Sequence, residues 1–135
     1  MRKMLARFWR EDRGVGALEF ALVLPALVVV IAGIAQLGIL YMANAGLRHA
    51  LAEGARYATI WPRPSDTQIR DLIVSERFGL AGGGTVTTPV ITHGEADGAD
   101  YVDISASYTL DLNFVFFTVD DVTLTDTRRA YIHQN

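Results

Sequence analysis

The sequence predicts an α+β protein with a long N-terminal helix, a short second helix and a small antiparallel β-sheet head. Three observations lead to this fold class. An apolar run without charges covers Phe20 to Leu47, a proline-rich joint follows at Trp61 to Pro64, and beyond Thr85 apolar and polar residues alternate. A long apolar run predicts a helix, proline ends it, and alternation with period two predicts strands.

The apolar run is long enough to cross a membrane. Its 28 residues would form a helix of about 42 Å, whereas the hydrocarbon core of a bilayer measures about 30 Å. A cleavable secretory signal has a shorter apolar core, although Ala43 and Ala45 resemble the small residues of its cleavage site. We therefore expect a single membrane-spanning helix from about residue 15 to residue 60.

The charge distribution predicts the orientation of this helix. Residues 1–13 contain five Lys/Arg and two acids, whereas residues 48–135 contain seven Lys/Arg and twelve acids. Basic residues are retained on the cytoplasmic side, so the N-terminus should stay inside and the C-terminal part should be exported. The chain contains no cysteine, which excludes a lipidated cysteine, disulfides and thiolate metal sites. The basic residues are Arg2, Lys3, Arg7, Arg10 and Arg13.

The C-terminal half of the long helix is amphipathic. Apolar and small residues recur at spacings of three and four, while Arg48, Glu53 and Arg56 lie off this stripe. We expect the stripe to pack on the protein's own head, and contact with a partner helix is the alternative. The stripe consists of Leu47, Ala50, Leu51, Gly54, Tyr57 and Ala58.

Within the apolar run, Pro25 removes a helical hydrogen bond and should bend the first turns locally. Gly33 and Gly38 would allow a second helix to approach closely, and Gln36 adds a polar group able to bond across such an interface. The alternative is the ordinary composition of a membrane helix, because no strict Gly-xxx-Gly motif is present. Both interpretations stay open at this point.

The head should begin with a short helix that Ser65 or Asp66 caps and that ends at Gly79. Gly82 to Gly84 form a linker, because a phosphate-binding loop would need a following Lys-Ser/Thr. Three runs of alternating residues then predict strands. The runs are Val86 to Val90, Val102 to Leu110, and Val122 to Leu124 continued by Ala130 to Ile132.

Two turns should separate these strands, at residues 92–98 and 113–121. The second turn contains Phe114, Phe116 and Phe117. We expect these rings to fold back as a lid on the core, and an exposed aromatic patch for a partner is the alternative.

The residue types give no sign of catalysis, a cofactor, a metal or a nucleic-acid site. His49, His93 and His133 are too scattered to be metal ligands, and Arg128-Arg129 is too short for a nucleic-acid patch. A group of four acids could hold calcium, but the ligand spacing of a calcium loop is missing, so a solvated acidic turn is favoured. These acids are Glu95, Asp97, Asp100 and Asp103.

One acid stands at the start of the apolar run. Glu19 precedes Phe20, and an ionised carboxylate near an apolar helix is rarely left without a partner. It either extends toward the interface, pairs with Arg13 of an uncleaved anchor, or pairs with another positive charge.

Two blocks of sequence carry a family resemblance. A basic leader, Gly14, small residues, Glu19-Phe20 and an apolar run resemble the class III signal of type IV pilin-like proteins. The later block Glu53-Gly54-Ala55-Arg56-Tyr57 resembles the segment that follows the membrane helix in the TadE-like family, the minor pseudopilins of tight-adherence (type IV-like, Flp) pilus systems. Gln36 stands where many members carry an acid.

The resemblance implies that prepilin peptidase cleaves after Gly14, so that residues 1–14 are a leader, Val15 is the mature N-terminus, and residues 61–135 form an exported head. It implies a single-pass protein of the bacterial inner membrane that is no enzyme and has no small-molecule substrate. Its partners would be other pilin-like subunits and the inner-membrane assembly platform. The alternative is a signal-anchored envelope protein whose exported head binds a partner or ligand.

Overall fold

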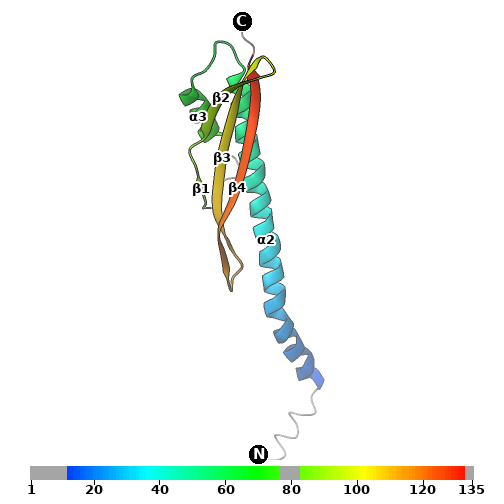
Figure 1. Cartoon of the computed structure of the whole chain (residues 1–135). Helices are drawn as coiled ribbons and strands as arrows, with labels where there is room; N and C mark the ends of the chain where they lie inside the picture. The colour runs from blue at the N-terminus through cyan, green and yellow to red at the C-terminus, as the bar shows by residue number, and fades with distance from the viewer. Residues whose placement is uncertain (1–11, 77–82, 133–135) are drawn as a thin grey trace, which may run out of the picture.

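A computed structural model describes residues 12–76 and 83–132 of the chain (Figure 1). It confirms the predicted α+β class: a long helix, a short helix and a four-stranded antiparallel sheet. The elements are α2 (Asp12–Ala58), α3 (Asp66–Ser75), β1 (Thr85–Val86), β2 (Val90–Ala96), β3 (Ala99–Asn113) and β4 (Thr118–Ile132).

Helix α2 runs without interruption from the lower end of the molecule to the top (Figure 1). Pro25 lies inside it and does not end it. The helix ends at Ala58, two residues earlier than predicted, because the next turn is tighter: the amides of Thr59 and Ile60 donate to the carbonyls of Arg56 and Tyr57. With 47 residues, α2 is about 70 Å long.

Helix α3 begins where the sequence predicts. Ser65 is its N-cap and forms a reciprocal capping box with Gln68, in which the Gln68 amide donates to Ser65 Oγ at 3.3 Å and Ser65 N donates to Gln68 Oε1 at 2.8 Å. The helix ends at Ser75 and Glu76 is its C-cap. The sequence predicts a helix that continues to Gly79, so the prediction is too long from Glu76 onward. Residues 77–82 lie outside the described part, as does His133.

Strand β3 is the centre of the sheet. Strand β4 pairs antiparallel with β3 along nearly its whole length, and β2 and then β1 pair with successive parts of its other edge. The β3–β4 hairpin is long and narrow and runs beside α2 toward the N-terminal end of the helix (Figure 1). Its loop, residues 114–117, therefore lies far from the rest of the head.

Both predicted turns were too wide. Residues 92–96 belong to β2, and only Asp97 and Gly98 form the turn, with φ values of 53° and 75°. An Asp-Gly pair with two positive φ values is the preferred two-residue hairpin connection. At the second turn, Thr118 to Asp121 already belong to β4. Between the pairs Leu110–Val122 and Leu112–Val119, β4 contains one residue more than β3, which is a bulge in the ladder. Polar, exposed strand residues resembled turns in both places.

The core lies between the upper half of α2 and one face of the sheet. Leu51, Ile104 and Tyr108 are completely buried, and Leu47 and Ala50 are nearly so. The predicted stripe of α2 thus packs on the protein's own head, as expected. Burying each large apolar side chain contributes about 1.5–3 kcal/mol, so this seam holds the head on the helix.

Candidate functional site

The predicted processing segment lies at the lower end of α2. Gly14 and Val15 are both inside the helix, so the Gly14–Val15 peptide bond is helical in the uncleaved chain. Glu19 and Phe20 follow on the same helix and are exposed, with Phe20 exposing 62% of its surface. Among side chains of residues 15–76 and 83–132, none forms an ion pair with Glu19. Its carboxylate is thus free of this chain's described cations.

The lower half of α2 is an apolar surface that the head leaves mostly uncovered. In the described part of the chain, one helix is long and apolar enough to cross a membrane, and its most apolar window is not buried. Most of its large side chains are exposed, from Ile39 at 40% to Leu22 at 73%. An apolar surface of this extent on a helix of this length fits a membrane anchor.

Three residues predicted to pack helices in the membrane have different surroundings. Gln36 Nε2 donates to the carbonyl of Asn113 at 2.7 Å, so it bonds to the hairpin loop of this same chain. Gly33 faces Phe114, whose ring would lie 3.8 Å from a Cβ atom at this position. Gly38 faces open space. Gly38 thus stays available for a partner helix, whereas the other two already contact the head.

The sequence did not predict this contact between the hairpin loop and the apolar helix. The prediction that the phenylalanines of this loop fold back as a lid on the core is wrong for two of them. Phe116 and Phe117 expose 66% and 53% of their surface. Phe114 is partly buried and stacks on Phe117, with ring centroids 4.8 Å apart. The loop is therefore an exposed aromatic patch, with one ring packed toward α2.

The predicted family block lies at the upper end of α2, where α3 crosses it. Arg56 forms an ion pair with Glu53 at 2.9 Å, one turn earlier on the exposed side. Gly54 faces Ile73 of α3, and a Cβ atom at this position would lie only 2.5 Å from the Ile73 side chain. Ala55 and Tyr57 are partly buried against the core. The block thus forms a tight helix crossing in which glycine lets α3 approach.

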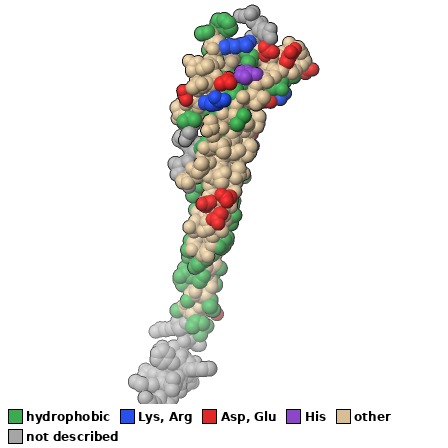
Figure 2. All heavy atoms as spheres, turned by 60° about the vertical axis from the view of Figure 1, so that its left-hand side comes forward, with side chains coloured by type: hydrophobic (Ala, Val, Ile, Leu, Met, Phe, Trp, Pro, Cys, Tyr) green, Lys and Arg blue, Asp and Glu red, His purple; other side chains and the backbone are tan. Residues whose placement is uncertain are grey.

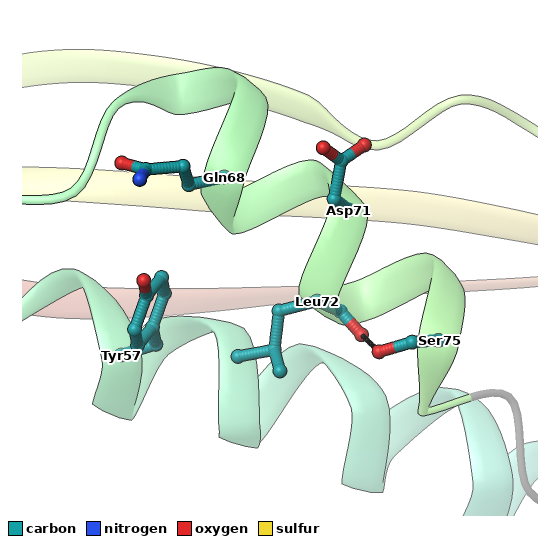
Figure 3. A pocket seen from close by; sticks show the side chains of 5 residues that line it. All are labelled: Tyr57, Gln68, Asp71, Leu72 and Ser75. Atoms are coloured by element: carbon teal, nitrogen blue, oxygen red, sulfur yellow. Dashed lines mark hydrogen bonds between the residues drawn. The ribbon is translucent and has the colours of Figure 1, made fainter.

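A shallow groove lies beside this crossing (Figure 3). Tyr57 lines it from α2, and Leu72 with three polar residues lines it from α3. The Ser75 hydroxyl donates to the Leu72 carbonyl at 2.7 Å, so it serves its own helix. The groove lies along the seam where α3 packs on α2. The polar residues are Gln68, Asp71 and Ser75.

The charged side chains at the top of the head form pairs between elements. His93 of β2 lies 2.9 Å from Asp66 of α3. Arg129 of β4 contacts Asp103 of β3 with two hydrogen bonds of 2.7 and 2.8 Å and lies over the Tyr101 ring. Within residues 12–76 and 83–132, no group of three or more His, Asp or Glu is placed to hold a metal ion.

We expect the Asp103–Arg129 pair to make the stability of the head depend on pH. The hydrogen bonds from Arg129 lower the pKa of Asp103 below its ordinary value. A lowered carboxyl pKa contributes stability above the unfolded pKa, and this contribution is lost as the pH falls through the folded value. We expect the melting temperature of the head to fall as the pH drops from about 5 to about 3, and to fall less in Asp103→Asn.

The control for this measurement is Asp97→Asn, at an exposed turn position whose positive φ suits Asn. It should keep the full pH dependence of the unmodified protein. An equal fall in Asp103→Asn and in the control would show that the pair contributes nothing.

Comparison with known families adds one finding. The family model described as TadE-like protein matches residues 14–56, which include the processing segment, the apolar helix and the helix crossing up to Arg56. Comparison with curated proteins and with solved structures gave no match. The matched residues follow α2 from the predicted cleavage site to the predicted family block and leave out the sheet. Over residues 14–56 the chain is therefore TadE-like, as the two sequence blocks predicted.

Proposed function

We propose that the chain is a minor pseudopilin, or pilus-assembly protein, of a tight-adherence pilus system. Prepilin peptidase processes it after Gly14, and it then acts through contacts with pilin-like subunits and the inner-membrane assembly platform. It sits in the bacterial inner membrane with the basic leader in the cytoplasm and the head outside, either staying there or entering the pilus. The TadE-like match, from a family that is associated with these pili and is non-enzymatic in general, carries this proposal.

The architecture supports a role in assembly. Helix α2 consists of an upper half that packs on the head and a lower half whose apolar surface is exposed. In lipid, such a surface anchors the chain, and the same surface packs against like helices in an assembly. Gly38, which faces open space, and the small residues near it allow close approach.

Processing would create a positive charge near Glu19, for which the described side chains of residues 15–76 and 83–132 provide no ion-pair partner. Cleavage before Val15 produces an α-amino group, which is largely cationic at neutral pH. Val15 and Glu19 are four residues apart on α2, about one helical turn. The amine of one subunit and the carboxylate of the same or a neighbouring subunit offset part of each other's desolvation cost, and between subunits they do so only in one axial register.

The mass of the mature protein tests this proposal. Protein purified from its own host membranes should begin at Val15, and substituting Gly14 by a bulky residue should leave the leader attached. The measurement is intact mass together with N-terminal sequencing. A matched Gly16→Ala variant changes a nearby glycine that has open space around it and should be processed normally.

A chain that keeps Met1 in cells with an active prepilin peptidase would contradict the proposal. That outcome would instead support the signal-anchored envelope protein, whose head binds a partner or ligand without entering a pilus.

A further inference from the structure

The loop of the β3–β4 hairpin lies at the level of the membrane helix. Two contacts fix this level: Gln36 donates a hydrogen bond to the Asn113 carbonyl at 2.7 Å, and the Phe114 ring packs at Gly33. Both helix residues are within the segment that is long and apolar enough to cross a bilayer. The position of the loop relative to the bilayer is therefore set by the position of α2.

The depth of Gly33 follows from helix geometry. It lies 18 residues after Val15 and 13 residues after Phe20, the first residue of the uncharged run. These separations correspond to about 27 Å and about 20 Å along the helix, against about 30 Å of hydrocarbon. Gly33 therefore lies within the hydrocarbon core, below its outer boundary, whether Val15 or Phe20 marks the inner boundary. A tilted helix would place it deeper.

The head prevents the bilayer from lying higher on α2. Arg48 of the helix is 4.0 Å from Asp126 of β4, so charged groups of both elements share that level. Nearer the loop, Asp111 Oδ1 accepts a hydrogen bond from the Asp121 amide, and Asp120 is adjacent. Asp111 precedes the last paired residue, Asn113, by two strand positions, about 7 Å. These carboxylates belong in water or among headgroups.

The side chains of the loop suit the lipid that this geometry gives them. Val115, Phe116 and Phe117 are all more than half exposed, and the residues of the loop carry no charge. Val115 has a φ of 76°, a conformation that normally favours Gly or Asn. Gly or Asn at this position would suit the backbone and expose little apolar surface. Val115 instead exposes 61% of an apolar side chain. Figure 2 shows Asp and Glu side chains gathered midway along the molecule, with mainly hydrophobic side chains on the described surface below.

From these observations we infer that residues 114–117 form a second membrane contact, a hydrophobic foot immersed in the outer leaflet beside α2. The occupant of this surface is lipid. This contact has a different effect from anchoring by the helix. A single membrane helix can tilt and rotate, whereas two immersed segments fix the tilt and rotation of the head on the membrane. The inference rests only on membrane anchoring by α2 and needs neither cleavage nor a pilus.

Site-directed spin labelling of the full chain in phosphatidylcholine vesicles tests the foot. The chain has no cysteine, so single-cysteine variants give unique labels. Phe116→Cys reports the loop, Leu27→Cys reports the apolar helix, and Thr127→Cys reports an exposed position high on β4. Phe116 is 66% exposed, so its replacement should not disturb the fold. The label at 116 should, like that at 27, collide more with oxygen than with a water-soluble nickel chelate.

Three outcomes are distinguished. The first supports the foot: collisions of the label at 116 with oxygen exceed those with the nickel chelate, and this excess persists as the protein is diluted with lipid. The second overturns it: the label at 116 collides with the nickel chelate as often as the label at 127 does, while the label at 27 still collides mainly with oxygen. This result would leave the membrane anchor and the proposed function intact. Shielding from both reagents that disappears on dilution with lipid would mean that a second copy of the chain covers the loop, which also overturns the lipid assignment.

Discussion

On the proposed function, replacing Glu19 by Gln should leave the protein in the membrane at its normal level and lower the amount of assembled pilus by about tenfold or more. The substitution keeps the size and hydrogen-bonding capacity of the side chain and removes only its charge. Under the proposed processing, the new N-terminal ammonium would then meet no carboxylate at the apolar boundary. Leaving one charge of a desolvated pair without its partner is strongly unfavourable.

The measurement is the quantity of sheared pili relative to the membrane level of this protein. Glu95→Gln is the matched control, because Glu95 is an exposed acid on β2, far from the lower end of α2. Normal piliation in Glu19→Gln at normal protein level would remove the carboxylate from the assembly mechanism. Reduced membrane insertion in that variant would assign Glu19 to the anchor instead.

Replacing Gly54 by Val should destabilise the head by about 2–3 kcal/mol. Gly54 faces the Cγ1 and Cδ1 atoms of Ile73, which would lie 2.5 and 2.6 Å from an added Cβ atom. Ile73 is itself 3% exposed, so its side chain has no free space to move into. A larger residue at an exposed helical glycine would ordinarily strengthen the helix, and at this crossing the overlap outweighs that gain.

Thermal unfolding of the full chain in micelles measures this effect, and a shift of about 4–8 °C per kcal/mol is expected for a head of this size. Gly38→Val is the control, since that glycine of the same helix faces open space. Combining Gly54→Val with Ile73→Ala removes the overlapping atoms and should recover part of the loss. Additive losses in the double variant would show that the two residues do not clash.

Much of the fold follows from local sequence patterns. The uncharged run predicts the membrane helix, and Ser65 with Gln68 three residues later is the sequence signature of the capping box that begins α3. The alternation from Val102 to Leu110 gives the buried face of β3 correctly, because side chains of a strand point to opposite faces in turn. Each of these patterns depends on residues close together in the chain.

The widths of the turns did not follow from composition. Thr92 to Ala96 are mostly exposed polar or small residues on an edge strand, and such residues resemble a loop when only their polarity is considered. Asp97-Gly98 was the more specific signal, since this pair favours the two positive φ values that a tight hairpin needs. This pair therefore marks the observed end of β2 at Ala96.

The sequence by itself determined that this protein is an apolar helix joined to a small sheet, with a TadE-like segment at residues 14–56. Hydropathy period, proline and capping act over a few residues, so the chain order alone carries them. Only the tertiary structure decided that the hairpin loop contacts the helix at Gly33 and Gln36. Gln36 and its hydrogen-bond partner Asn113 are 77 residues apart along the chain. That meeting depends on strand length, register and the side of α2 that the sheet covers, and alternation gives the faces of a strand without giving its pairing.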